Sequence, residues 1–100
     1  MTQVQVTYWR DLPSLVVARD GDDVVKIQLA ARFQEAIDEA AMRLGDTDAD
    51  AYLAGWTRSE WEPVEGDPSW VAAERSRALE EQWTEEGLLA YLDSLDSGSR

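Results

Sequence analysis

The chain has no cysteine and no histidine among its 100 residues. The first absence removes the thiolate nucleophile and a soft metal ligand, and the second removes the side chain that most often transfers protons near neutral pH. Basic residues are few: nine Lys and Arg stand against 21 Asp and Glu, which gives a formal net charge of −12. Nucleic acids and anionic membranes need clustered cations, so this composition argues against both as partners.

No apolar run approaches the roughly 20 residues of a membrane-spanning helix, and the N-terminus lacks the basic and apolar regions of a signal peptide. We therefore expect a cytoplasmic protein. A length of 100 residues suits a single domain. We place this domain at residues 1–93 and expect a frayed C-terminal tail at 94–100, where Ser and Gly are frequent.

Tryptophan, by contrast, is abundant, with residues at positions 9, 56, 61, 70 and 83. Each indole side chain can bury about 150–250 Å². Five exposed ones would create a larger apolar surface than soluble monomers usually show, so most of them must pack in a core or against another molecule. Together with the missing histidine and cysteine, this favours a contact surface over a reaction centre.

Residues 3–9 alternate between polar and apolar side chains with the period of a half-buried strand. Val4, Val6 and Tyr8 are predicted to face the core. Asp11 and Pro13 mark a turn, and residues 15–18 follow it as a second strand. These two segments predict an antiparallel hairpin.

Apolar residues then recur at helical spacing, which predicts one long helix over residues 24–44 that ends at Gly45. A short helix is expected at 48–56, an edge strand containing Pro63 at 61–65, and further helices between 68 and 92. The predicted fold class is therefore α+β. It consists of a small antiparallel sheet of two or three strands packed against the long central helix and two or more further helices.

Asp46, Asp48 and Asp50 have the spacing that opens a calcium-binding loop. The rest of the loop does not follow, because Ala51 stands in place of the turn glycine and Thr57 in place of the final glutamate. We expect no metal site, since helix capping and solubility explain these carboxylates. We also expect no cofactor, because the chain has no glycine-rich phosphate loop, nucleophile elbow or zinc spacing.

One aromatic residue conflicts with the strand pattern. Trp9 lies on the opposite face of the first strand from Val6 and Tyr8, beside Gln5 and Thr7. Either another helix covers that face or Trp9 contacts another molecule. We predict the second, with a protein partner or another copy of the chain, while a small-molecule ligand stays open.

Charged residues close to Trp9 in the predicted fold extend this candidate site. The full candidate interaction or ligand site, with no catalytic residue assigned, is Trp9, Arg10, Asp11, Arg32, Asp38, Met42 and Trp61. For its charged members the alternative is structural: a buried Arg–carboxylate pair could join the first strand to the long helix.

Three blocks of sequence show a family resemblance. They are Tyr8-Trp9-Arg10-Asp11 followed by Pro13, Arg32 to Met42 followed by Gly45, and Asp50 to Trp56. In order and spacing, these blocks resemble the small bacterial "virulence factor" domain family, which is also found at the C-terminal end of conserved virulence factor C proteins. The resemblance covers roughly residues 4–65.

The resemblance implies no reaction and transfers no catalytic residue. We therefore expect a noncatalytic cytoplasmic interaction or accessory protein. The family also tends to accompany methyl-transfer genes, so the resemblance implies one alternative, an accessory subunit of a one-carbon or corrinoid methyl-transfer system. A small enzyme that works through carboxylates is the other alternative, because glutamate residues are plentiful.

Overall fold

The computed structural model describes residues 1–45 and 48–98, with side chains through Leu95. Within these ranges the chain forms five strands and four helices, so the predicted α+β class is confirmed. In chain order the elements are β1 (Thr2–Trp9), β2 (Leu12–Asp20), β3 (Asp23–Gln28), α1 (Ala31–Leu44), α2 (Ala49–Ala54), β4 (Trp56–Arg58), β5 (Glu62–Val64), α3 (Pro68–Gln82) and α4 (Glu85–Gly98).

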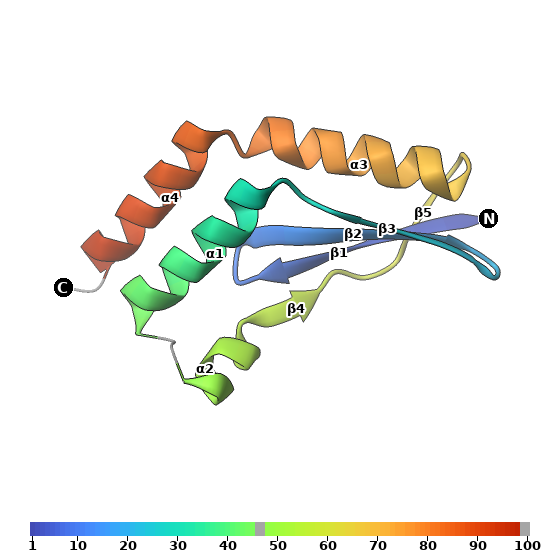
Figure 1. Cartoon of the computed structure of the whole chain (residues 1–100). Coiled ribbons are helices and arrows are strands. Elements are labelled where there is room, and N and C mark those ends of the chain that lie inside the picture. Colours follow the sequence, from blue (N-terminus) through green and yellow to red (C-terminus); the bar gives the residue numbers. More distant parts are fainter. Residues whose placement is uncertain (46–47, 99–100) are drawn as a thin grey trace.

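All strands belong to one antiparallel sheet with the order β3-β2-β1-β4, and β5 also pairs with β1 (Figure 1). The predicted hairpin is the β1–β2 pair, in which Val4 faces Ala18 and Val6 faces Val16. On its other side, β1 pairs with β4 over Thr7–Trp9 and with β5 over Thr2–Val4. The sheet therefore has more than the two or three strands that the sequence predicted.

The prediction of one helix over residues 24–44 is wrong, because its first part is strand β3. Asp20 pairs with Asp23 across a tight turn in which Gly21 has a φ of 59°. After the turn, Val25 and Ile27 are partly buried while Lys26 is exposed, which is the alternation of a strand. The spacing of apolar residues in this segment fits a helix and a strand equally well. The segment forms a strand because it pairs with β2.

The short helix predicted at 48–56 is shorter in the structure. α2 ends at Ala54, and Trp56 begins strand β4. The expected edge strand at 61–65 is confirmed as β5, with Pro63 paired to Gln3 at the margin of the sheet. Where the sequence predicted a frayed tail from residue 94, helix α4 continues to Gly98, and Leu95 packs against the core.

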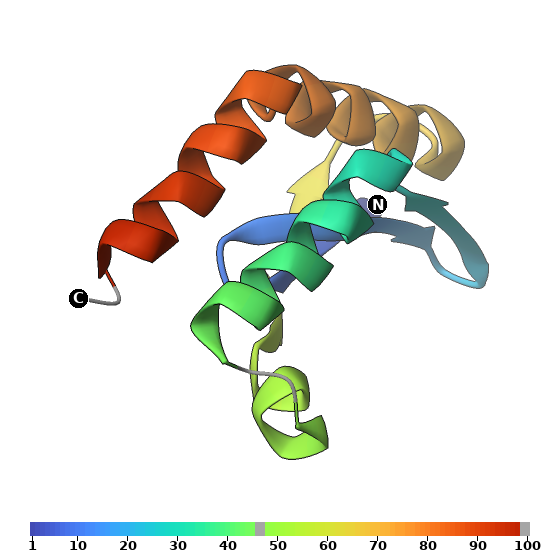
Figure 2. The ribbon, with the colours of Figure 1, turned by 60° about the vertical axis from the view of Figure 1, so that its left-hand side comes forward.

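Two helices, α1 and α3, cover one face of the sheet. α3 contacts β1, β2 and β3, while α1 contacts β2 and packs against α4 (Figures 1 and 2). The face they cover presents Val4, Val6, Val16 and Ala18 to a single core that also includes Phe33, Ile37, Val71 and Leu92.

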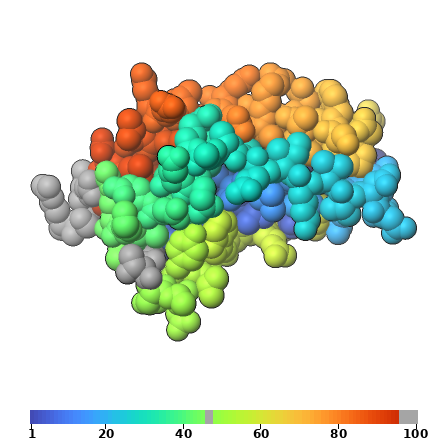
Figure 3. All heavy atoms as spheres, viewed as in Figure 1, coloured from blue at the N-terminus to red at the C-terminus, as the bar shows by residue number. Residues whose placement is uncertain are grey.

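The molecule is elongated, 47 × 29 × 19 Å, with the β2–β3 hairpin projecting at one end (Figure 3).

Helix α3 begins where the sequence predicted a helix to begin. Pro68 is its first residue, and the Asp67 carboxylate accepts a hydrogen bond from the Trp70 amide at 3.2 Å. Among the described residues, no helix is both long enough and apolar enough to cross a membrane.

Candidate functional site

Trp9 is fully buried, so its predicted role as an exposed contact residue is wrong. The strand pattern did assign its face: Trp9 pairs with Trp56 and Thr7 with Arg58, two positions along β4, which puts Trp9 and Thr7 on one side of the sheet. Helix α2 packs on this side of the sheet, over Trp9. The indole N–H of Trp9 donates to the Tyr52 carbonyl at 2.8 Å, and the two rings lie 5.8 Å apart.

Gly55 allows this close approach of α2. A Cβ atom at this position would lie 2.5 Å from Nε1 of Trp9, which is shorter than any ordinary contact. The Arg10 amide also donates to the Gly55 carbonyl at 2.8 Å. Trp9 therefore packs against a segment of its own chain. Of the two alternatives that the sequence left for this residue, the covering helix is correct.

The β1–β2 turn holds the next two predicted residues, and both are exposed. Arg10 has a φ of 53°, and its guanidinium carbon lies 5.3 Å from the centre of the Trp9 ring. Asp11 accepts a hydrogen bond of 3.3 Å from the Tyr91 hydroxyl on α4. Burial, together with the negative charge of Asp11, raises the pKa of Tyr91 above its usual value of 10.0.

Arg32 does not pair with a carboxylate of the first strand. Its Nη2 donates to the backbone carbonyls of Glu80 at 2.9 Å and Trp83 at 3.3 Å, where α3 ends. A cation is favourable at this position because the unpaired carbonyls give the helix terminus a partial negative charge. The Glu80 carboxylate in turn accepts the Ala30 amide at 3.1 Å, so these contacts fasten the start of α1 to the end of α3.

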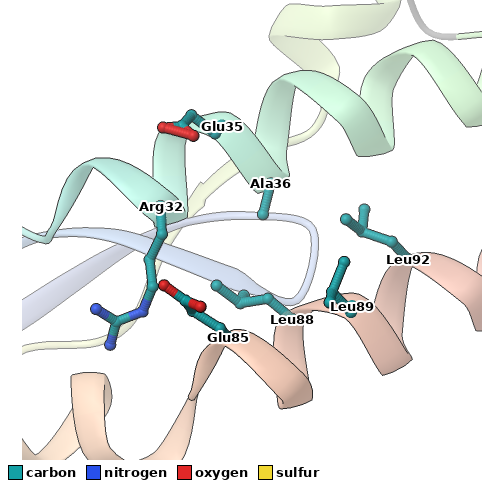
Figure 4. A pocket seen from close by; sticks show the side chains of 7 residues that line it. All are labelled: Arg32, Glu35, Ala36, Glu85, Leu88, Leu89 and Leu92. Carbon is teal, nitrogen blue, oxygen red and sulfur yellow. The ribbon is translucent and has the colours of Figure 1, made fainter.

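A groove of about 270 Å³ lies between α1 and α4 (Figure 4). Leucine side chains of α4 form much of its lining, and Glu35 and Glu85 stand at its margin. The full lining is Arg32, Glu35, Ala36, Glu85, Leu88, Leu89 and Leu92. Both carboxylates are exposed, whereas paired catalytic carboxylates are commonly tuned by burial. The groove therefore does not favour the carboxylate-based enzyme.

Asp38 and Met42 lie on the solvent side of α1. Asp38 accepts a hydrogen bond of 3.0 Å from the Gln34 amide, and Met42 is 62% exposed. Asp11, Arg32 and Asp38 thus make three separate contacts, and the structure does not gather the predicted charged residues into one site.

Trp61 differs from the other predicted residues, because it lies beside the uncovered surface of the sheet. The guanidinium carbon of Arg19 lies over the Trp61 ring, 3.7 Å from its centre. Arg19 also donates from Nε to the Gln3 side chain at 3.2 Å. We name the sheet surface opposite the core the open face. Outside the part that α2 covers around Trp9 and Trp56, its strand residues are Gln3, Gln5, Thr7, Leu15, Val17, Arg19, Val24, Lys26, Gln28, Arg58 and Pro63.

The open face has an unusual charge for such an acidic chain. Its three charged strand residues, Arg19, Lys26 and Arg58, are all cations, and none of its strand positions bears a carboxylate. In the part of the chain that the structure describes, Lys26 and Arg58 form no ion pair. Between them lies a shallow hollow of about 200 Å³, lined by Gln5, Thr7, Leu15, Val17, Lys26 and Arg58.

The sequence did not identify this group of residues. Lys26 fell inside the predicted long helix and Arg58 followed a predicted helix, so neither had a strand partner in the expected fold. Gln5 and Thr7 were assigned to the correct face by alternation. The signal that could have located Lys26 is the Asp-Gly turn at residues 20–21, followed by alternation from Val24.

The aspartates around the start of α2 have the spacing that opens a calcium-binding loop. Asp46 lies outside the described residues. Asp48 caps α2 by accepting the Ala51 amide at 2.8 Å, which is the capping role expected of these carboxylates. Among the side chains that the structure describes, in residues 1–45 and 48–95, no three of the metal-binding types lie close enough to hold an ion.

These features define a small α+β domain with a helix-covered core face and a cationic open face. The family model described as virulence factor matches residues 7–91 of the chain. The match runs from the last part of β1 into α4, so it extends beyond the blocks that suggested the resemblance. The chain belongs to the virulence factor family. No curated protein and no solved structure matches it.

Proposed function

We propose that this member of the virulence factor family is a noncatalytic binding module and that the open face is its contact surface. The supporting observation is that the helices leave most of one face of the sheet uncovered. α1 and α3 pack on the core side, and α2 covers the other side only around Trp9. The remainder combines apolar Leu15 and Val17 with Lys26 and Arg58, which form no ion pair with any residue that the structure describes.

The role proposed for the protein is that of a cytoplasmic accessory protein that acts by holding a partner. Sheet surfaces of a folded domain are rigid, because cross-strand hydrogen bonds fix the positions of their side chains. Such a surface loses little conformational entropy when it binds, which favours specific contact by a domain of this size.

A capture experiment with two matched double variants tests this proposal. Lys26→Gln with Arg58→Gln removes two charges from the open face, and Arg75→Gln with Arg77→Gln removes two from α3. We expect the wild type and the α3 variant to capture the same proteins from an extract of the native cell, and the open-face variant to lose them. Circular dichroism confirms that each bait is folded.

Capture that survives in the open-face variant would contradict the proposal, and so would equal loss in both variants. A wild-type bait that retains no specific protein would contradict it as well. The identity of a retained protein also separates a general accessory role from one in methyl transfer.

A further inference from the structure

We infer that the open face binds an extended protein segment in which two acidic side chains, four residues apart, flank an apolar one. This inference rests on the proposed function, because it names the chemistry of the partner at the same surface. It follows from the positions of Lys26 and Arg58 and from what lies between them.

The two cations stand at opposite sides of the sheet. Lys26 is on β3 and Arg58 is on β4, and the strand order β3-β2-β1-β4 puts three interstrand steps between them. Neighbouring strands lie about 4.8 Å apart, so three steps separate the two backbones by about 14 Å. Along the strand direction the two positions differ by one pleat, because Lys26 is level with Gln5 of β1 and Arg58 with Thr7. Both side chains are exposed and long, so they can adjust to this offset.

An extended segment that crosses the strands matches this separation. At about 3.4 Å per residue, side chains four positions apart lie about 14 Å from each other and point to the same side. Carboxylates at these two positions would reach Lys26 and Arg58, and the guanidinium group of arginine suits a carboxylate in particular. The pattern acidic-x-apolar-x-acidic therefore places charge opposite charge at both ends.

The middle residue of such a segment lies over the hollow. Leu15 and Val17 provide its apolar floor, and Gln5 and Thr7 line its other side with groups that can bond to a peptide backbone. An apolar side chain placed here is removed from water between the two ion pairs. The surface therefore favours an apolar residue in the middle over a uniformly acidic segment.

A single-stranded nucleic acid fits the same surface less well. Such ligands usually stack their bases on exposed aromatic rings, and the face of Trp61 is already covered by the Arg19 guanidinium at 3.7 Å. This feature favours the acidic protein segment.

Nuclear magnetic resonance titration of the isotope-labelled chain tests the inference. The probe is the capped peptide Ser-Glu-Ser-Leu-Ser-Glu-Ser. We expect the amide signals that shift to belong to β1, β2, β3 and β4, around Val17 and Lys26. Binding should weaken about twofold to thirtyfold in the Lys26→Gln, Arg58→Gln variant, which is the range for the loss of two exposed ion pairs. The Arg75→Gln, Arg77→Gln variant should bind as the wild type does.

Altered probes test each part of the pattern. Replacing the peptide leucine by serine should weaken binding, and replacing both glutamates by lysine should abolish it. Equal binding of either altered peptide would overturn the inference. If a short oligothymidylate shifts the same signals at a lower concentration than the peptide, the inference is wrong and the ligand is a nucleic acid. If the chain forms a dimer that only the open-face variant loses, the inference is also wrong and the partner is a second copy of the chain.

This result can be separated from that of the capture experiment. If capture depends on Lys26 and Arg58 but the peptide does not bind, the binding function stands and the inferred partner pattern is wrong. If neither experiment depends on the open face, both the function and the pattern are wrong.

Discussion

The contact between Gly55 and Trp9 gives the sharpest test of the structure. Replacing Gly55 by alanine would add a Cβ atom 2.5 Å from Nε1 and 2.6 Å from Cε2 of the indole ring. The ring cannot move aside easily, because Trp9 is fully buried and its N–H is bonded to the Tyr52 carbonyl. The backbone of Gly55 has an ordinary φ of −75°, so the added methyl group, rather than its backbone, causes the strain.

Two effects of the Gly55→Ala change oppose each other. Overpacking of a buried site costs about 1–3 kcal/mol, and reduced freedom of the unfolded chain returns about 0.4–1 kcal/mol. We expect a net loss of about 1–2 kcal/mol in the free energy of unfolding. In a Trp9→Phe background, which lacks Nε1, the same change should cost less than in the wild type by about 1 kcal/mol or more.

Urea denaturation followed by far-ultraviolet circular dichroism measures these free energies without relying on tryptophan fluorescence. Gly87→Ala is the matched control. A Cβ atom there meets only Thr84 Oγ1 at 3.5 Å, and its helical position should gain up to about 1 kcal/mol. If Gly55→Ala is as neutral or stabilising as Gly87→Ala, then α2 does not pack on Trp9 as described.

Other side chains give further expectations for the same denaturation assay. Phe33→Ala should cost about 3–5 kcal/mol, because Phe33 is 1% exposed; a loss below about 1 kcal/mol would contradict its place in the core. Arg32→Met should cost about 1–3 kcal/mol through its bonds to the end of α3, whereas exposed Arg77→Met should barely shift the midpoint. The raised pKa of Tyr91 means that the folded state holds the phenol proton more tightly than the unfolded chain. Its contribution to stability is thus present below about pH 10 and is lost as the pH rises through the raised value. Tyr91→Phe should lack this alkaline loss, and an unchanged pH dependence would show that Tyr91 is not its source.

Much of the fold could be predicted from local patterns. Alternation identified β1, the Asp67-Pro68 pair marked the start of α3, and Pro63 marked an edge strand. These signals are local, because each depends on backbone geometry or on capping within a few residues. β3 was missed since Val25 and Leu29 are spaced for either a helix or a strand, and only pairing with β2 resolves that choice.

The candidate site was less predictable than the fold. The sequence assigned Trp9 to the correct side of β1 but could not show that α2 returns to cover it, because Tyr52 and Gly55 lie more than 40 positions along the chain. It also indicated no relation between Lys26 and Arg58. Their common face depends on the order of the strands, which sequence-distant hydrogen bonds establish.

By itself, the sequence determined the α+β class, the acidic charge, the family and the absence of thiol and imidazole chemistry. These properties follow from composition, periodicity and short motifs, which exist before the chain folds. Only the tertiary structure decided which tryptophan is buried and which cations meet on one surface. Those outcomes depend on strand order and on the docking of α2, where packing of distant segments outweighs local preference.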